Sequence, residues 1–581
     1  MNTVIDGDLF DVIVVGTGIA GAVVAKQLGL AGRRVLLIEA GEAIPHGRAA
    51  HLERFYLDTH KYPEAPYPVN PNAQSATVAD LIEKDASPSY LDQSPRDNYT
   101  SFGSTYERRA GGTMWHWMGT CLRLLPSDFH LKTLYGRGVD WPIEYDDLGL
   151  KVRSDGLSYY DRAEREIGVS ANKADQWYNA AAAPFRADYQ FPNPGIPLSR
   201  VDQFFRDGVQ GMTFEGYPVS VIPTPAGRNS RPYDGRRVCA GNTNCVPICP
   251  IEAKYDPTVT LHKAFNTGNV SALFQHVATK LILDEAKRRV TGVEYISYSD
   301  ATKVSPSGRG IARAKQYVVA AHGIETPKLL LLSGCKNRNI GLNLMDHPFY
   351  LKWGLAPRPV FPYRGPLSTA GLDGLRDGQF RRDRSAFRIE IGNDGWNLGA
   401  SDPTSTLLDF IEGNNKSKTN ESRESLFGGN LVTRLNDIYT RQCRIGFELE
   451  QIPSETNRVT LSNSKDALGI PRPKITYSLS DYEKRALGAA DRLTSALFAK
   501  LGIADKTSYE LVMGAGHIIG TYRMGNDAST SVVTKEQRSH EFDNLYLLGS
   551  GVFPTSGTGN PSLTIAALAF WAADTIHDEL R

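Results

Sequence analysis

The 581-residue chain is long enough for more than one hydrophobic core, and 41% of its residues are hydrophobic. It carries 65 basic and 64 acidic residues, so a net charge of +1 excludes the basic field that nucleic-acid binding requires. The longest apolar stretches, such as residues 563–573 and 329–332, fall short of the roughly 18 residues that cross a bilayer. These features favour a large soluble enzyme of two domains without a transmembrane segment.

Residues 10–39, FDVIVVGTGIAGAVVAKQLGLAGRRVLLIE, have the order strand, glycine turn, helix, strand and acid. Residues 10–15 are a continuous apolar run typical of a strand buried on both faces, and residues 19–31 have helical periodicity. Glycines in such a turn allow a pyrophosphate to approach the helix N-terminus, and a carboxylate after the second strand suits ribose hydroxyls and disfavours NADP. We therefore predict a dinucleotide site formed by Gly16, Gly18, Gly21 and Glu39. These residues alone leave FAD and NAD both open.

Residues 544–551, NLYLLGSG, indicate a C-terminal strand that runs into glycines, and an apolar helix is predicted over 564–576. Further strands are predicted where apolar residues alternate or cluster, over 273–277, 280–284, 290–295, 317–321, 443–450 and 458–461. A C-terminal strand and helix of this kind is expected to return beside the first strand.

Other blocks follow in order along nearly the whole chain: AGGTMWHWMGT at 110–120, AAHGIETPK at 320–328, NLMDHP at 343–348, HIIGTYRMG at 517–525 and the C-terminal GTGNPSL. With the N-terminal unit they make the chain similar to the glucose-methanol-choline (GMC) oxidoreductases, a family of FAD enzymes that oxidise alcohols. The resemblance implies FAD and an α/β fold. It implies a Rossmann-like FAD-binding domain and a discontinuous substrate domain of α+β type, built on an antiparallel sheet.

The resemblance also implies alternating segments of the two domains. FAD-binding segments are expected over 1–170, 250–345 and 505–581. Substrate-domain segments are expected over 171–249, which contains the cysteine loop, and over 346–504. Residues 63–101, rich in Pro, Ser, Asn and Asp, would be a lid over the cofactor. Residues 151–158 interrupt a helix predicted over 145–167 and look like an insertion relative to the family, with no function assigned.

Three of the six cysteines fall within eleven residues, in CAGNTNCVPICP. The spacing of Cys239, Cys245 and Cys249 allows a disulfide with a spare thiol, a zinc site completed by a distant histidine, or an iron–sulfur cluster. The Cys-Pro ending and the Gly- and Asn-rich loop, whose amides would donate to sulfide, favour the cluster without excluding the others. The isolated cysteines are expected to be buried structural thiols: Cys121, Cys335 and Cys443.

The segment RNSRPYDGR at 228–236, with the cysteine loop, resembles the catalytic subunits of membrane-linked bacterial sugar dehydrogenases, a branch of this family that carries a [3Fe-4S] cluster. The resemblance implies Cys239, Cys245 and Cys249 as its three ligands, although Ala240 stands where those relatives have another cysteine. It also implies a cytochrome c or quinone acceptor, a small companion subunit that provides export, and a place on the periplasmic face of the inner membrane. Residues 1–9 predict neither a signal peptide nor a twin-arginine leader, and a cytoplasmic location is the alternative.

Alcohol oxidation by a flavin needs a base for the hydroxyl proton, and the neutral pKa of histidine suits that role. His517 lies among glycines in GAGHIIGTYRMG; by the resemblance it matches the catalytic base, and Asn560 matches the partner that hydrogen-bonds the substrate oxygen. Asp346 and His347 are expected to be structural turn residues. His116, in WHW, would either carry FAD covalently or pack against it through hydrogen bonds. The implied cofactor contacts are Gly111, Gly112, His116, Val277 and Gly551.

The predicted function is an FAD-dependent dehydrogenase that oxidises a sugar or polyol hydroxyl to a carbonyl, with a [3Fe-4S] cluster that passes on the electrons. Two alternatives stay open. A pyranose-type sugar oxidase would form hydrogen peroxide and keep the cysteines as structural residues. A hydroxynitrile lyase-like flavoprotein would retain a flavin that is not reduced in turnover.

Overall fold

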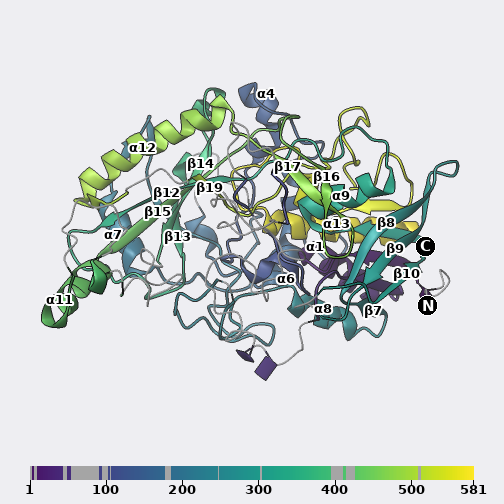
Figure 1. Ribbon diagram of the computed structural model, residues 1–581. Coiled ribbons are helices and arrows are strands. Elements are labelled where there is room, and N and C mark those ends of the chain that lie inside the picture. The colour runs from purple at the N-terminus through teal and green to yellow at the C-terminus, as the bar shows by residue number, and fades with distance from the viewer. Residues whose placement is uncertain are drawn as a thin grey trace.

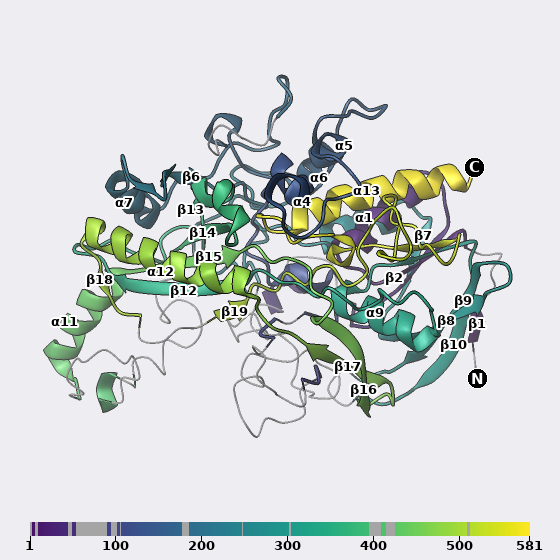
Figure 2. The ribbon, with the colours of Figure 1, turned by 90° about the horizontal axis from the view of Figure 1, so that it is seen from above.

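The computed structural model describes residues 3–5, 10–43, 49–50, 52–53, 90–93, 102–104, 106–176, 185–246, 248–300, 304–393, 408, 410–413, 425–507 and 512–581. Two parts lie side by side in Figures 1 and 2. One contains a parallel sheet and both ends of the chain, and the other contains an antiparallel sheet along which one long helix runs. The predicted lid at 63–101 lies mostly outside the described residues.

The first part is built on a five-stranded sheet whose neighbouring strands are all parallel, in the order β20-β11-β2-β3-β7. The strands are β2 (Val12–Val15), β3 (Val35–Ile38), β7 (Val270–Leu273), β11 (Gln316–Val319) and β20 (Leu545–Leu547). β2, β3, β11 and β20 are buried along their whole length, as expected for continuous apolar runs. The predicted Rossmann-like unit and its C-terminal strand are thus confirmed.

Helices surround this sheet: α1 (Ile19–Leu30), α5 (Tyr145–Gly149), α6 (Tyr159–Ile167), α8 (Thr258–Phe265), α9 (His322–Ser333) and α13 (Ser562–Glu579). α1 packs against both α8 and α13, and buried side chains from all three join one core with the parallel strands. The predicted interruption at 151–158 is confirmed, because α5 ends at Gly149 and α6 restarts after the N-cap Ser158.

A four-stranded sheet extends the first part in the order β1-β10-β9-β8. It contains β1 (Thr3–Ile5), β8 (His276–Asp284), β9 (Arg289–Ser297) and β10 (Gly308–Ala312). The prediction of one strand over 273–277 was wrong. Leu273 ends β7 in the parallel sheet, and β8 begins three residues later, after Gln275 takes the left-handed conformation with φ 57°.

The second part is a seven-stranded sheet in the order β18-β12-β15-β14-β13-β6, with β19 beside β12. Its strands are β6 (Val221–Pro223), β12 (Pro348–Leu355), β13 (Ala370–Leu372), β14 (Phe387–Gly392), β15 (Gln442–Leu449), β18 (Ala504–Asp505) and β19 (Val512–Gly514). All its pairings are antiparallel, as predicted for the substrate domain.

One face of this sheet packs on α12 (Asp481–Leu501), the long helix along the sheet in Figure 2. Phe387, Ile389 and Ile391 of β14 share a core with the apolar side chains of α12. Because side chains alternate along a strand, the residues between them face the opposite side, toward the first part. That opposite face carries charged residues, which are described with the site below.

The remaining described elements are short or peripheral. They are α4 (Leu131–Tyr135), α7 (Arg200–Gly208), α11 (Gly428–Tyr439), the hairpin β4 (Thr213–Phe214) and β5 (Tyr217–Pro218), and the hairpin β16 (Arg458–Lys465) and β17 (Pro471–Thr476). Within the described ranges, no helix combines the length and apolarity needed to cross a membrane.

Candidate active site

The glycine loop between β2 and α1 leaves its backbone open to a ligand. Gly18 is the N-cap of α1; no side chain caps this helix end, and a Cβ atom at Gly18 would meet nothing within 4 Å. Gly16 has φ +97°, and a Cβ atom on Gly21 would lie 2.0 Å from the Gly16 carbonyl oxygen. The loop therefore presents uncapped amides and the positive end of a helix, which suits a pyrophosphate.

Glu39 follows β3 beside this loop. Its buried carboxylate accepts the Thr17 amide at 2.9 Å, the Thr17 hydroxyl at 2.6 Å and the Gly41 amide at 2.8 Å. Burial raises the pKa of Glu39, and these hydrogen bonds oppose that rise. The acid thus stands where a ribose would bind.

Gly111 and Gly112 belong to a second loop that touches the first. The Gly111 amide donates to the Thr17 hydroxyl at 3.3 Å, and a Cβ atom on Gly112 would lie 3.3 Å from the Gly18 Cα atom. The structure therefore brings the two predicted glycine loops together, although Gly18 and Gly112 lie more than 90 residues apart in sequence.

His116 follows this second loop and is buried. Its Nε2 atom contacts the Glu107 carboxylate, which is also buried and lies 3.3 Å from the Arg109 guanidinium. The contact with Glu107 fixes the ring from one side. Both predicted roles of His116, covalent attachment of FAD and packing against FAD through hydrogen bonds, stay predictions.

Gly551 and Val277 are the remaining predicted cofactor contacts. Gly551 is in the 3-10 turn Ser550–Val552, which follows β20 at the carboxyl edge of the parallel sheet. Val277, at the start of β8, packs with Ile296 in an apolar cluster that Ala40 also contacts, next to Glu39. Their roles in binding FAD stay predictions. The uncapped end of α1, the Glu39 carboxylate and the two neighbouring glycine loops together fit a bound dinucleotide.

His517 and Asn560 meet, although they lie 43 residues apart. The Asn560 Nδ2 atom is 3.3 Å from the His517 Nε2 atom; Asn560 is buried, and His517 is partly exposed. His517 lies in the segment that follows β19. Two residues later, Ile519 pairs with Met345, which precedes β12: the amide of each residue donates to the carbonyl oxygen of the other at 2.9 Å. The structure thus brings the predicted pair of catalytic residues into contact, and backbone pairing holds the segment that carries His517.

The same pairing places Asp346 and His347 in the site. The Asp346 Oδ1 atom accepts the backbone amide of His517 at 3.0 Å and that of His347 at 2.7 Å. The Nδ1 atoms of His347 and His517 are 3.0 Å apart, and the His347 Nε2 atom is 3.1 Å from the Gly557 carbonyl oxygen. Asp346 and His347 were expected to be structural turn residues; both also contact the candidate base, Asp346 through the backbone amide of His517 and His347 through its ring.

Charged side chains on the free face of the antiparallel sheet complete the site. Arg388 lies opposite Glu448 in the register of β14 and β15, and Gly392 lies opposite Arg444. The Glu448 Oε1 atom is 3.3 Å from the Asn560 Nδ2 atom and 3.5 Å from the Arg388 Nη1 atom. The Arg444 guanidinium is 3.3 Å from the Glu390 carboxylate. All four charged side chains are buried, and each has an opposite charge within 4 Å.

These charges set the protonation of the site. Burial, followed by the neighbouring His347, lowers the pKa of His517 to about 3, and the Glu448 carboxylate opposes this effect. Burial raises the pKa of Glu448, but Arg388 and the two histidines hold it below its ordinary value. At neutral pH His517 is therefore uncharged and able to accept a proton, and Glu448 is ionised beside it.

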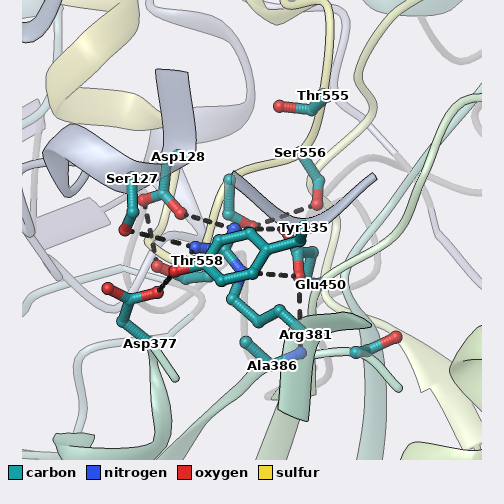
Figure 3. Close-up of polar contacts among 12 residues, drawn as sticks. Ser127, Asp128, Tyr135, Asp377, Arg381, Ala386, Glu450, Thr555, Ser556 and Thr558 are labelled. Atoms are coloured by element: carbon teal, nitrogen blue, oxygen red, sulfur yellow. Dashed lines mark hydrogen bonds and ion pairs between the residues drawn. The ribbon is translucent and has the colours of Figure 1, made fainter. Parts of the chain in front are cut away.

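A buried ionic network, centred on Arg381, supports the loop that carries Asn560 (Figure 3). The Arg381 guanidinium binds Asp128 at 3.0 Å, Asp377 at 3.2 Å and Glu450. Asp128 in turn accepts the hydroxyl of Thr558 at 3.0 Å, two residues before Asn560. The network joins both parts of the protein at the site, because Phe129, next to Asp128, lies in the core of the first part and Glu450 follows β15 of the second.

The cysteine loop contacts a buried arginine, Arg228. The Arg228 Nη1 atom is 3.3 Å from the Cys245 sulfur, and the Gly241 amide donates to the Cys239 sulfur at 3.4 Å. Cys245 and Cys249 are buried, whereas Cys239 is partly exposed. All six cysteines are free in the structure, which gives the disulfide alternative for this loop no support. Among the described residues, no group of three or more His, Cys, Asp or Glu side chains has the arrangement of a metal-ion site.

Lys254 joins the cysteine loop to the segment around His116. Its buried ammonium group donates to the carbonyl oxygens of Trp115 at 2.7 Å, Trp117 at 2.8 Å and Cys245. Neither Lys254 nor Arg228 forms an ion pair with a carboxylate in the part of the chain that the structure describes, and both are buried. Two buried cations beside three cysteines fit an anionic group held by thiolates.

Of the isolated cysteines, Cys121 and Cys443 are buried and Cys335 is partly buried. Burial raises the pKa of each thiol, to about 12 for Cys335 and Cys443. They are protonated at neutral pH and therefore inert, as expected for structural thiols.

Sequence reasoning missed Glu448, Arg388, His347, Arg228 and Lys254 as site residues. One partial signal was present for the sheet: FRIEIG and QCRIGFEL alternate charged and apolar residues, although only the second was predicted as a strand. Such alternation predicts one apolar and one polar face, and it does not show that the polar face is covered by another part of the chain.

Comparison with known proteins agrees with this geometry. The sequence matches two descriptions of the GMC oxidoreductases, over residues 199–349 and 453–569, and an NAD(P)-binding Rossmann-like domain over residues 14–70. It is 31% identical to the fructose dehydrogenase large subunit of Gluconobacter japonicus over 98% of each chain. It is 24% identical to the gluconate 2-dehydrogenase flavoprotein of Pantoea cypripedii, over 98% of this chain and 94% of that one.

Solved structures share the fold. A formate oxidase superposes over 99% of this chain and 100% of its own with a TM-score of 0.62 at 16% identity, and a pyridoxine 4-oxidase from Mesorbium loti over 98% and 99% with a TM-score of 0.60 at 17% identity. With the long match to a sugar dehydrogenase subunit, the family is shown. The chain belongs to the GMC oxidoreductases and is an FAD-dependent enzyme that acts on alcohol or sugar donors.

Proposed function

We propose that the protein is a dehydrogenase that oxidises a hydroxyl of a neutral sugar or polyol to a carbonyl and passes the electrons through a [3Fe-4S] cluster to an external acceptor. The observation that carries the proposal is the contact of His517 with Asn560 beside the charged sheet face. Bound FAD supplies the hydride acceptor, and a bound cluster supplies a one-electron relay.

His517 and Asn560 supply the acid–base part of the reaction. The neutral His517 takes the hydroxyl proton of the substrate, and Asn560 orients the hydroxyl oxygen. Glu448 stabilises the imidazolium that results, because its negative charge raises the pKa of His517. The substrate loses the hydroxyl proton to His517, and the carbon that carries this hydroxyl would lose a hydride to bound FAD.

The sheet face supports a neutral, polyhydroxylated substrate. Arg388 and Arg444 provide donors, and Glu390 and Glu448 provide acceptors, so the face offers several hydrogen-bonding groups to hydroxyls. Each charge already has an opposite charge within 4 Å, so an ionic substrate finds little net attraction there. This balance favours sugars and polyols over sugar acids and amino sugars.

Anaerobic reduction of the bound flavin tests the reaction class. We expect D-fructose, D-glucose or D-sorbitol to bleach the flavin absorbance, and D-gluconate and D-glucosamine to be poor reductants at equal concentration. A flavin that only gluconate or glucosamine reduces would contradict a neutral substrate. No bleaching by any compound would favour the lyase alternative, and peroxide formation without an added acceptor would favour the oxidase.

The cluster is supported by the charges around the cysteine loop. Cys239, Cys245 and Cys249 provide three thiolates, and the buried Arg228 and Lys254 compensate their negative charge. Lys254 also contacts the carbonyl oxygens of Trp115 and Trp117, which places the loop next to the predicted flavin-contacting segment. Because Cys239 is partly exposed, a cluster in this loop would also lie near the surface, where an external acceptor can approach.

Replacing Cys239 with alanine is expected to remove the cluster but not the sugar chemistry. Iron, about three atoms per wild-type chain for a [3Fe-4S] cluster, should be lost. Reduction of cytochrome c with sugar should fall by about tenfold or more, whereas anaerobic flavin bleaching should stay within about threefold of wild type, because His517 and Asn560 are untouched. Iron analysis and stopped-flow absorbance provide the two readouts. Cys335→Ala is the matched control, since its thiol lies outside the loop; iron retained in Cys239→Ala would refute the ligand assignment.

Partners and location belong to the same proposal. A cluster that accepts electrons singly implies a cytochrome c or a quinone as the acceptor. A small companion subunit would provide export, and the complex would work on the periplasmic face of the inner membrane. In support, the relative with 31% identity bears the name of a large subunit.

A further inference from the structure

Five groups at the active site form one continuous chain of hydrogen bonds. It runs from the Glu448 carboxylate to the Asn560 amide at 3.3 Å, to the His517 ring at 3.3 Å, to the His347 ring at 3.0 Å, and to the Gly557 carbonyl oxygen at 3.1 Å. The two rings are nearly perpendicular, at 85°. The order of protons along this chain decides which nitrogen of His517 is free to act as a base.

The two ends of the chain fix that order. At one end, the amide nitrogen of Asn560 faces the Glu448 carboxylate, which only accepts, so this nitrogen donates to Glu448 and to the His517 Nε2 atom. At the other end, the carbonyl oxygen of Gly557 only accepts, so the His347 Nε2 atom carries a proton. With a donor at one end and an acceptor at the other, two neutral imidazoles satisfy every contact in a single arrangement.

In that arrangement His347 accepts at Nδ1 and His517 donates from Nδ1. The His347 ring is buried, and among the described residues no carboxylate oxygen lies within 4 Å of its nitrogens. The charged groups that face the two rings are Asp346 on the adjoining backbone, Arg388 on β14 and Glu448 on β15.

We infer that His347 is a positioning residue that fixes the tautomer of His517, because it accepts the Nδ1 proton and so holds the lone pair on Nε2, beside Asn560. When His517 takes the substrate proton, its Nδ1–H bond to His347 becomes charge-assisted, so the ring keeps its position during the transfer. His347 also ties His517 to the Gly557 loop that carries Asn560. The inference rests on the proposed role of His517 as the base.

Two substitutions at one position separate this role from a structural one. His347→Phe keeps a flat ring but offers no acceptor, whereas His347→Gln offers an amide oxygen to His517 and an amide nitrogen to Gly557. We expect His347→Phe to lower the limiting rate of anaerobic flavin reduction by about 100-fold, the low end of a general-base effect, with FAD content and half-saturating sugar concentration retained. His347→Gln should recover most of that rate.

A rate within threefold of wild type in His347→Phe would overturn the inference. So would a His347→Gln variant as slow as His347→Phe.

Nitrogen-15 NMR of the wild-type protein, labelled on its histidine rings, tests the tautomer even if a variant fails to fold. The His517 signals, identified by their loss in His517→Gln, should show a protonated Nδ1 and an unprotonated Nε2 atom. The reverse assignment would overturn the role of His347 while leaving the proposed function standing. That function fails instead if His517→Ala reduces flavin normally.

Discussion

Replacing His517 with alanine is expected to slow the reduction of bound flavin by sugar by about 100-fold or more, the range of a lost general base, without loss of FAD. The reason is local: His517 is the only side chain within hydrogen-bond distance of both Asn560 and His347 in the described part of the chain. Stopped-flow absorbance under anaerobic conditions measures the rate directly. In wild type the rate should be constant across neutral pH and fall in acid, because a protonated His517 accepts no proton and its pKa lies near 3.

His130→Ala is the matched control for this experiment. His130 lies at the surface, paired with Glu144 at 2.6 Å and outside the site contacts described above. We expect it to reduce flavin at the wild-type rate. A near-normal rate in His517→Ala would remove His517 from the reaction.

Replacing Arg381 with methionine is expected to be the most destabilising of the changes considered. Asp128 and Glu450 have no exposed side-chain surface, and both lose their cationic partner. An uncompensated buried charge of this kind costs about 3–5 kcal/mol of folding free energy. Urea unfolding followed by circular dichroism should show the loss. Because Asp128 also holds Thr558, the flavin reduction rate is expected to fall as well.

Arg382→Met provides the same chemical change at the next residue. Arg382 is exposed, so its replacement should alter the free energy of unfolding by about 0.5 kcal/mol or less. Equal urea midpoints for Arg381→Met and wild type would contradict a supporting role for the network in Figure 3.

The parts of the fold that were predictable carry local signals. The first strand, the glycine turn, the helix and Glu39 lie within 30 residues, and their order alone indicates the unit. The break at residues 151–158 was predictable for the same reason. The end of β7 was not, because residues 273–277, LFQHV, have the pattern of one strand, whereas two different sheets divide them.

The site was predictable only in part, because its residues come from strands that meet through register. His517 and Asn560 were found through family motifs. Arg388 and Glu448 reach the site because β14 pairs with β15 and turns their alternate face toward Asn560. His347 was taken for a turn residue because nothing in NLMDHP reveals that this segment pairs with the chain around Ile519. Long-range pairing of this kind leaves no mark in a short sequence window.

Low-temperature EPR of anaerobically purified protein, before and after addition of the sugar that reduces the flavin, tests the central claim most directly. The account predicts a signal in the oxidised protein from a [3Fe-4S] centre on Cys239, Cys245 and Cys249. Sugar should abolish that signal in wild type but not, on the same time scale, in His517→Ala. An oxidised protein that is EPR-silent and free of iron, yet forms peroxide with sugar, would contradict the relay and make the protein an oxidase.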